Sequence, residues 1–309
     1  MINVLFAAGT ENWTDYQSPL IQAFQAADLD VDLSLSHAPQ QTDYIIYAPS
    51  SDLQDFAPYQ NCKAVLSLWA GVEKIVSNQS LTMPLCRMVD PGLTQGMVEW
   101  VTGHCLRYHL NIDASLATPN GIWQPKVPPL AQERHITILG LGQLGQACAI
   151  ALSQLGFQVT GWSRSPKTLA NVTCTHGQDG LQQALSTAEI LILLLPNTPA
   201  TDNTLNAKTL AQLPQSARII NPGRGSLIED AALLDALNSD HIAHATLDVF
   251  RQEPLPATDP YWAHPKVTVT PHIAADTRAS TASQVIAENI RRGQAQQPLL
   301  HLVDRSSGY

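Results

Sequence analysis

Short apolar runs alternate with amphipathic or polar segments along most of this chain of 309 residues. In its first part, five runs have the length and composition of β-strands: 2–7, 30–34, 43–47, 63–68 and 85–89. The helical or loop segments between these runs predict a first α/β unit. A long helix is expected at 94–109, and a Pro-rich connector follows it at 119–129.

The pattern is more regular after the connector. Six further strands are expected at 135–139, 157–162, 190–195, 217–221, 244–249 and 267–270. Several are continuous runs of Ile, Leu and Val, as strands buried on both faces require. Helical segments alternate with them, so a doubly wound parallel sheet is predicted. The last helical segment, 277–292, has no following strand in this sheet and could carry the C-terminal tail back to the first unit.

The first of these strands runs into the turn Gly140-x-Gly142-x-x-Gly145, and a helix-forming segment follows at 146–155. In a dinucleotide site the first glycine permits a tight turn, the second lets the backbone approach a pyrophosphate, and the third lets helix and strand pack closely. The helix N-terminus then presents free N–H groups to the phosphates. Such a motif alone is often an ordinary Gly-rich turn, but the strand before it and the helix after it favour a dinucleotide site.

The end of the next strand bears on which dinucleotide is bound. About 20 residues past the glycines, an NAD enzyme usually has Asp or Glu for the ribose 2′-hydroxyl. Here the chain has Ser163, Arg164 and Lys167 and no carboxylate. A guanidinium binds phosphate oxygens in a fixed fork, so this set suits the 2′-phosphate of NADP. The alternative is a solvated polar turn, but the missing acid favours NADPH over NADH.

Charge excludes several classes of partner. The chain has 17 Lys and Arg against 26 Asp and Glu, a net charge of −9. An acidic chain without a run of Lys or Arg is a poor candidate for binding nucleic acid or an anionic membrane. Any anionic substrate must therefore be held by local positive groups.

The five cysteines are odd in number, form no CxxC and lie mostly in apolar segments, so we expect free thiols in a reducing compartment. The first residues lack a basic segment and resemble a strand, and no apolar run approaches a membrane span. A cytoplasmic location is the default expectation. No His or Cys pair has the context of a metal site, and we expect no metal.

Three polar residues follow predicted strands of the second unit, at the sheet edge where open parallel sheets bind ligands. Arg224, between two glycines that would let it turn into a crevice, could pair with the carboxylate of a 2-oxo acid and polarise its carbonyl. His272 could donate the proton that accompanies hydride transfer, and Glu253 could orient His272 and favour its charged form. Each residue alone has an ordinary structural explanation, but their joint placement after a glycine turn favours catalysis.

These residues belong to a set of motifs that resembles one enzyme family. In chain order the motifs are GLGQLG (140–145), GWSRSPK (161–167), LLPNTPAT (194–201), NPGRGSLIEDAALLDAL (221–237), LDVFRQEPLP (247–256), VTVTPHIAA (267–275) and VDRSSGY (303–309). The chain resembles the D-isomer-specific 2-hydroxyacid dehydrogenases, and most closely their bacterial NADPH-dependent glyoxylate/hydroxypyruvate reductase branch. The resemblance covers almost the whole chain.

The resemblance implies an α/β protein with two doubly wound parallel-sheet domains. Residues 1–96 and 281–309 would form a discontinuous, flavodoxin-like substrate-binding domain, and residues 97–280 a Rossmann dinucleotide-binding domain. The long helix and the arm after it, from Met97 to about Pro125, resemble the family's dimerisation region and imply a homodimer.

The resemblance also implies roles for individual residues. Arg224, Glu253 and His272 would form the catalytic triad. The substrate would be bound by Tyr47, Trp69 and the backbone amides of Ala70, Gly71 and Val72. The cofactor, NADPH with NADH as a weaker alternative, would be bound by Gly140, Gly142, Gln143, Leu144, Gly145, Ser163, Arg164, Ser165, Lys167, Leu195, Pro196, Asn197, Thr198, Asn221, Pro222, Asp248 and Ala274.

The chain departs from the family pattern at three points. Ala274-Ala275 stands where Gly-Gly often follows the catalytic His, a change that also occurs in the reductase branch. Trp69 stands where many members have a small residue and would narrow the substrate pocket, or it could instead point into the core. Tyr47 stands where Trp is expected in the closest relatives, which leaves the substrate preference open.

The favoured function is NADPH-dependent reduction of a small 2-oxo acid, glyoxylate to glycolate or hydroxypyruvate to D-glycerate, with His272 as the proton donor. One alternative is a dinucleotide-sensing binding protein, since fold does not fix function. The complete triad argues against a sensor, which needs no proton donor. The other alternative is a dehydrogenase for a different 2-oxo acid, although a phosphorylated substrate would need more Lys or Arg in 47–73 than Lys63.

Overall fold

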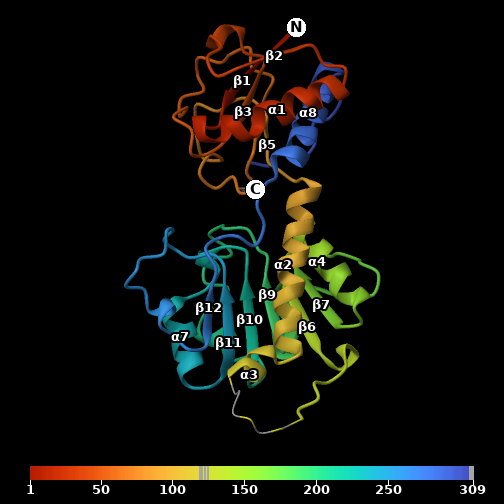
Figure 1. The fold of residues 1–309 in the computed structure, drawn as a ribbon, viewed down its shortest axis with the longest axis vertical. Helices are drawn as coiled ribbons and strands as arrows, with labels where there is room; N and C mark the ends of the chain where they lie inside the picture. The colour runs from red at the N-terminus through yellow and green to blue at the C-terminus, as the bar shows by residue number, and fades with distance from the viewer. Residues whose placement is uncertain (118–120, 122, 124, 306–309) are drawn as a thin grey trace. The chain divides into compact units, whose positions relative to one another are not determined.

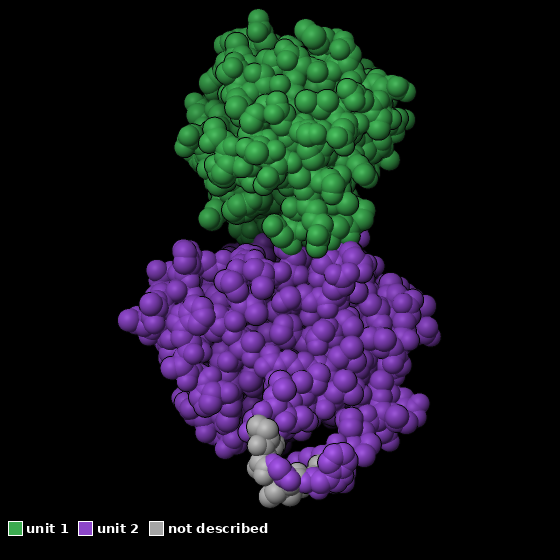
Figure 2. All heavy atoms as spheres, in the orientation of Figure 1, with its two compact units in different colours: residues 1–93, 276–309 green, residues 94–275 purple. Residues whose placement is uncertain are grey.

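The computed structural model describes residues 1–117, 121, 123 and 125–305. The chain divides into two compact units, residues 1–93 with 276–309 and residues 94–275 (Figure 2). These junctions lie a few residues before the expected ones at 96/97 and 280/281. The first junction falls within helix α2 (Pro91–His109), and a helix that continues through a junction gives no local sign of it in the sequence.

The first unit contains a five-stranded sheet in which all neighbours are parallel, in the order β2-β1-β3-β4-β5. Its strands are β1 (Ile2–Ala7), β2 (Val31–Ser34), β3 (Tyr44–Tyr47), β4 (Ala64–Ser67) and β5 (Leu85–Cys86). This is the strand order of flavodoxin-like sheets.

Helices α1 (Thr10–Ala26) and α8 (Ala279–Gln294) pack side by side in the first unit. The buried face of α1 carries Tyr16, Leu20 and Phe24, spaced four residues apart as one helix face requires. These side chains join the α8 residues and the sheet in one core. A second core covers the other face, so β3 and β4 are buried on both faces.

The second unit contains a parallel seven-stranded sheet in the order β12-β11-β10-β9-β6-β7-β8 (Figure 1). Its strands are β6 (His135–Leu139), β7 (Gln158–Ser163), β8 (Thr173–His176), β9 (Ile190–Leu193), β10 (Ala217–Asn221), β11 (Ile242–Leu247) and β12 (Val267–Val269). Its helices, after most of α2, are α3 (Ile112–Ala117), α4 (Gln143–Gln154), α5 (Gly177–Ser186), α6 (Ala207–Leu210) and α7 (Asp230–Asn238). Short 3-10 segments lie at Pro39–Gln41 in the first unit and at Ala131–Glu133, Gly225–Leu227 and Pro260–Trp262 in the second.

The strand order of the second unit reverses between β6 and β9, which makes the end of β6 the switch point where doubly wound sheets bind ligands. Cores on both faces bury the central strands, and every residue of β9 is buried. The predicted fold class, two doubly wound parallel sheets, is confirmed.

Some elements differ from the sequence-based expectation. Strand β8 was not predicted, because it is a short edge strand whose polar residues show no apolar run. Helix α4 begins three residues earlier than expected, directly after Gly142. The expected connector at 119–129, the dimerisation region and the motif 303–309 lie partly outside the described residues. Within the described ranges, no helix has the length and apolar character to cross a membrane.

Candidate active site

At two of the three glycines after β6, a side chain would collide with the protein's own backbone. Gly140 has a φ of +108°, and a Cβ there would lie 2.4 Å from the carbonyl oxygen of Leu194. A Cβ at Gly145 would lie 1.8 Å from the carbonyl oxygen of Gly140. At Gly142, where φ is −72°, a Cβ would meet no described atom within 4 Å. Neither packing nor conformation requires glycine at 142, and this open space is what the approach of a pyrophosphate needs.

Helix α4 begins at Gln143, and no side chain caps its N-terminus. The N–H groups of Gln143, Leu144 and Gly145 donate to no acceptor among the residues that the structure describes. Unpaired N–H groups and the helix dipole give this end a partial positive charge. The turn and the helix therefore fit the pyrophosphate of a dinucleotide.

The chain after β7 contains the residues that are expected to favour NADPH over NADH. The hydroxyl of Ser163 is buried and donates to the carbonyl oxygen of Ser165 (2.8 Å). This bond fixes the turn in which Arg164, Ser165 and Lys167 are exposed. Two cationic side chains are thus accessible at the carboxyl edge of the sheet, where a 2′-phosphate could be bound.

The loop after β9, which contains Leu195, Pro196, Asn197 and Thr198, is held by two residues that sequence reasoning missed. The hydroxyl of Thr201 donates to the carbonyl oxygen of Pro196 (2.6 Å) and accepts from the N–H of Thr198 (2.9 Å). Ser226 Oγ donates to Asn197 Oδ1 (2.9 Å). Leu195 is buried in the core. Thr201 lies within the motif 194–201, so its place in that motif was the available signal.

Asn221 ends β10, and its side chain holds the loop that contains Pro222 and Arg224. Its Nδ2 donates to the carbonyl oxygen of Arg224 (2.9 Å), and its Oδ1 accepts from the N–H of Gly223 (3.1 Å). A Cβ at Gly223 would lie 2.7 Å from the last carbonyl oxygen of β9, and a Cβ at Gly225 would lie 2.0 Å from the carbonyl carbon of Phe250. Neither glycine has a positive φ. Close packing, and not freedom to turn, explains the glycines around Arg224.

Asp248 follows β11, is 0% exposed and organises the loop that carries His272. Its Oδ1 accepts from Thr270 Oγ1 (2.5 Å) and from the N–H of Ile273 (2.9 Å), and its Oδ2 accepts from the N–H of Ala274 (2.9 Å). Its backbone carbonyl accepts from the N–H of His272 (2.8 Å). Thr270 was not selected from the sequence. Contacts from Asp248 and Ala274 to a cofactor stay predictions, and the structure adds this positioning role.

His272 and Glu253 form a hydrogen-bonded pair. His272 Nδ1 lies 2.7 Å from Glu253 Oε2, and Glu253 Oε1 accepts from the N–H of Phe250 (2.9 Å). An ionised carboxylate only accepts, so Nδ1 carries the proton of this bond. The other ring nitrogen, Nε2, bonds to none of the described residues, and the side chain is 50% exposed. Nε2 is therefore the atom that can exchange a proton with a ligand.

The backbone of His272 has a φ of +55°, in the left-handed region that residues other than glycine seldom adopt. Its N–H donates to the carbonyl oxygens of Asp248 and Thr270, which hold it there. Strained conformations that the surroundings enforce in this way cluster at functional sites.

The loops that carry Arg224, Glu253 and His272 are in contact beyond the ends of β10, β11 and β12. Gly225 packs against Phe250, the N–H of Phe250 donates to Glu253, and Glu253 accepts from His272. Arg224 Nη1 donates to the adjacent carbonyl oxygen at 223 (2.7 Å). The structure thus brings together the loops of the predicted triad, while the binding of one ligand by all three residues stays a prediction.

In the first unit, the loop after β4 presents three consecutive backbone amides. The N–H groups of Ala70, Gly71 and Val72 find no acceptor in the described parts of the chain. The preceding N–H, that of Trp69, is paired with Ser67 Oγ (3.1 Å). Successive unpaired N–H groups can form a site for an anion, and the binding of a substrate carboxylate here stays a prediction.

Trp69 and Tyr47 differ in their surroundings. Trp69 is 41% exposed, which argues against the alternative that it packs in the core. Tyr47 is 2% exposed, and its ring packs edge-on against Phe56 with the centroids 5.5 Å apart. Burial also raises the pKa of its hydroxyl. The structure shows the Tyr47 side chain packed in the core, and its contact with substrate stays a prediction.

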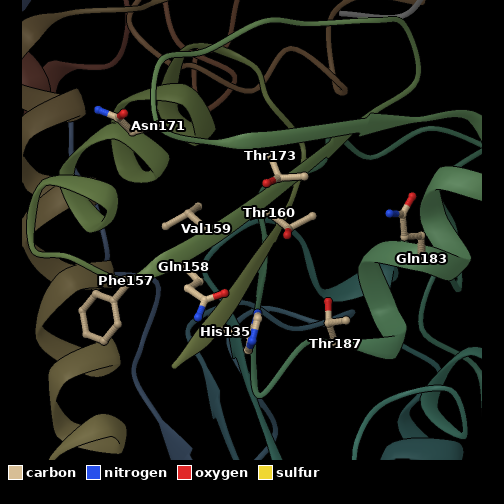
Figure 3. Close-up of a pocket in the computed structure, with 9 residues that line it drawn as sticks. All are labelled: His135, Phe157, Gln158, Val159, Thr160, Asn171, Thr173, Gln183 and Thr187. Carbon is tan, nitrogen blue, oxygen red and sulfur yellow. The ribbon is translucent and has the colours of Figure 1, made fainter. Parts of the chain in front are cut away.

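A separate hollow of about 320 Å³ lies at the amino ends of β6, β7 and β8 (Figure 3). Its lining includes the first residues of these strands, His135, Gln158 and Thr173, and Gln183 from α5. Parallel sheets bind ligands at the opposite edge, and no predicted site residue lines this hollow. It is therefore not part of the candidate active site.

Comparison with known proteins agrees with this geometry. Residues 104–274 match the family model of the D-isomer specific 2-hydroxyacid dehydrogenase, NAD binding domain. The glyoxylate/hydroxypyruvate reductase A of Yersinia enterocolitica is 38% identical over 279 residues, which cover 87% of this chain and 88% of that protein.

Two solved structures are similar over almost their whole length. A D-isomer specific 2-hydroxyacid dehydrogenase from Xanthobacter autotrophicus Py2, in complex with NADPH and MES, has a TM-score of 0.91 and 40% identity, covering 100% of this chain and 99% of that chain. An NADPH-dependent glyoxylate/hydroxypyruvate reductase from Sinorhizobium meliloti, in complex with NADP and sulfate, has a TM-score of 0.87 and 32% identity with the same coverage. The chain therefore belongs to the D-isomer-specific 2-hydroxyacid dehydrogenase family.

Proposed function

We propose that this protein reduces small 2-oxo acids, glyoxylate to glycolate or hydroxypyruvate to D-glycerate, with NADPH. The observation that carries the proposal is the Glu253–His272 pair at 2.7 Å, whose Nε2 is left for a ligand, on the sheet that also carries the glycine turn. Relatives named glyoxylate/hydroxypyruvate reductase A support the substrates, and relatives solved with NADPH or NADP support the cofactor. A proton-donating pair is not needed by a dinucleotide sensor, so the enzyme is favoured.

The two units would divide the work. Residues 94–275 would bind the dinucleotide, and Gly142 with the N-terminus of α4 would hold its pyrophosphate. When bound, NADPH supplies a hydride to the carbonyl carbon of the substrate. The first unit binds the substrate carboxylate through the N–H groups of Ala70, Gly71 and Val72.

Arg224 and His272 would act on the substrate carbonyl. The Arg224 guanidinium pairs with the carboxylate and polarises the carbonyl, so negative charge that develops on its oxygen is stabilised. His272 Nε2 gives that oxygen a proton as the hydride arrives. Glu253 accepts from Nδ1 throughout, so it orients the ring. Asp248 and Thr270 position this imidazole through the backbone.

We infer that NADPH is preferred over NADH. Arg164 and Lys167 are exposed after β7, and Ser163 fixes their turn through its bond to the carbonyl of Ser165. A charge-assisted contact from Arg164 to the 2′-phosphate would be made only by NADPH.

We also propose a homodimer formed through α2, α3 and the arm that follows. Several apolar side chains from the end of α2 onward are exposed, including Leu110 (45%), Leu116 (72%) and Trp123 (94%). A second copy of the chain would cover them. Light scattering of the native protein should give twice the mass of one chain, and Leu116→Asp should lower it to the mass of one chain. A native protein with the mass of one chain would contradict the dimer.

A cytoplasmic location is proposed on the state of the cysteines. All five are free thiols, and four of them are buried. Unpaired cysteines are typical of a reducing compartment.

A substrate panel tests the proposed function. Loss of NADPH absorbance is followed with glyoxylate, hydroxypyruvate, pyruvate and 2-oxoisocaproate. We expect kcat/KM to be highest for glyoxylate or hydroxypyruvate, and the same substrates to be poorer with NADH. No turnover of either acid with NADPH would reject the proposed function.

A further inference from the structure

The first unit has a cavity of about 340 Å³ beside Trp69. Its walls come from the start of α1, the end of β4 and the chain that leads into α8. The polar and aromatic residues that line it are Asn12, Asp15, Tyr16, Trp69, Asp276 and Thr277. Among the residues that the mechanism uses, Ala70 directly follows Trp69, and His272 lies four residues before Asp276.

The cavity combines two carboxylates with neutral hydrogen-bonding groups. Asp15 and Asp276 form no ion pair with any described residue, and no Lys or Arg lines the cavity. Two cationic residues adjoin the lining without being part of it. Lys74 Nζ lies 6.0 Å from the ring centroid of Trp69, and Arg278 stands between the lining residues Thr277 and Ala279. The lining itself thus carries two carboxylates and no Lys or Arg.

Tyr16 contributes a hydroxyl that no described residue binds. The residue is 6% exposed, yet its hydroxyl forms no hydrogen bond with the described chain. Burial, together with the charges of Asp276, Asp90 and Asp15, raises its pKa, so the group keeps its proton and acts as a donor. Asn12 Nδ2 is held by the carbonyl oxygen of Ala8 (2.7 Å), which leaves Oδ1 as an acceptor.

Trp69 links this cavity to the proposed substrate site. It lines the cavity and directly precedes the amides of Ala70, Gly71 and Val72. A 2-oxo acid is short, so with its carboxylate on those amides its other end can reach the carboxylates and the neutral groups of the cavity beside Trp69.

We propose that this cavity is a charge filter for the tail of the substrate. It accepts a neutral, hydroxyl-bearing tail, for which Tyr16 and Asn12 supply a donor and an acceptor. It excludes a tail with a second negative charge, a carboxylate or a phosphate, because Asp15 and Asp276 repel it and no Lys or Arg lines the cavity. The inference rests on the proposed function and narrows its substrate class to 2-oxo acids that carry one negative charge.

The test compares kcat/KM for hydroxypyruvate and oxaloacetate, with glyoxylate as the substrate that has no tail. Asp15→Asn, Asp276→Asn and the double variant remove the charges without changing shape. Asp32→Asn is the matched control, because Asp32 carries the same charge near the amino end of β2. Where turnover of oxaloacetate is too slow to measure, its inhibition constant against glyoxylate replaces kcat/KM.

We expect each single variant to improve oxaloacetate relative to hydroxypyruvate by about 3- to 10-fold, the scale of one partly screened charge at several ångströms. The double variant should improve oxaloacetate relative to hydroxypyruvate by more than either single variant does. Asp32→Asn should change this ratio by less than about twofold. Tyr16→Phe should lower kcat/KM for hydroxypyruvate by about threefold to tenfold, the scale of one neutral hydrogen bond, and leave glyoxylate unchanged.

An unchanged ratio in the double variant, with glyoxylate turnover intact, overturns the filter. An equal rise in kcat/KM for all three acids also overturns it, because such a rise would not depend on the charge of the substrate's tail. If the native protein reduces neither glyoxylate nor hydroxypyruvate with NADPH, the proposed function itself fails, and the two failures are thus distinguishable.

Discussion

Replacing Gly142 by alanine should separate cofactor binding from folding. The added methyl meets no described atom within 4 Å, and the backbone at φ −72° is open to any residue. Alanine also restricts the unfolded chain, which stabilises a compatible site by about 0.4–1 kcal/mol. We therefore expect the Tm of Gly142→Ala without ligand to be unchanged or raised by up to about 3 °C.

The same methyl occupies the space proposed for the pyrophosphate. Overpacking of a close contact costs about 1–3 kcal/mol, which corresponds to an NADPH Kd about 5- to 150-fold weaker. Calorimetric titration of the apoprotein measures Kd, and thermal unfolding without cofactor measures stability.

Gly145→Ala provides the matched control. Its Cβ would lie 1.8 Å from the carbonyl oxygen of Gly140, so the backbone must shift and the free energy of unfolding should fall by about 1–3 kcal/mol or more. The reasoning is refuted if Gly142→Ala binds NADPH as the native protein does. It is also refuted if Gly142→Ala is destabilised as much as Gly145→Ala.

The remaining predictions concern catalysis, specificity and pH. His272→Ala should lower kcat by about 100-fold or more with NADPH affinity nearly intact; near-native turnover would exclude His272 as the proton donor. Arg164→Ala should weaken NADPH by about 10- to 100-fold and leave NADH little changed in the same titration, whereas equal losses would mean that Arg164 does not contact the 2′-phosphate. Trp69→Ala should raise kcat/KM for 2-oxoisocaproate relative to glyoxylate, since it removes a wall; an unchanged ranking with lower stability would place Trp69 outside the site. Burial and the nearby Arg107 lower the pKa of His244 to about 4. Between pH 6.5 and 4, His244 is therefore protonated in the unfolded chain but stays neutral in the folded protein. Stability should fall as pH drops through this window, by about 1–2 kcal/mol more in the native protein than in His244→Asn after allowance for solvent screening, and equal losses in urea titrations would contradict this cause.

The fold could be predicted because its signals are local. The apolar run Ile190–Leu193 is a strand buried on both faces, and the glycines at 140, 142 and 145 mark a strand–turn–helix in consecutive residues. Strand β8 lacks such a signal, because its four residues gain their conformation from pairing with β7 along one edge.

The candidate residues could also be selected from the sequence, but the contacts that give them their roles could not. Asp248 holds Thr270 and Ala274, which lie 22 and 26 residues away, and no local pattern reveals that its oxygens are used there. Tyr47 lies at the end of a strand like other candidates, yet its ring packs against Phe56, a residue in an irregular loop. Gly225 reflects the approach of the loop at Phe250, which follows β11, and Gly223 reflects the approach of the end of β9.

Direct hydride transfer is the central claim, and isotopic labelling tests it. NADPH with deuterium at both C4 positions of the nicotinamide is incubated with hydroxypyruvate and the native protein, and the product is analysed by mass spectrometry and chiral chromatography. We predict D-glycerate with one deuterium at C2, formed in equal amount to the NADPH consumed. Product without deuterium, or consumption of NADPH without formation of D-glycerate, would contradict the account.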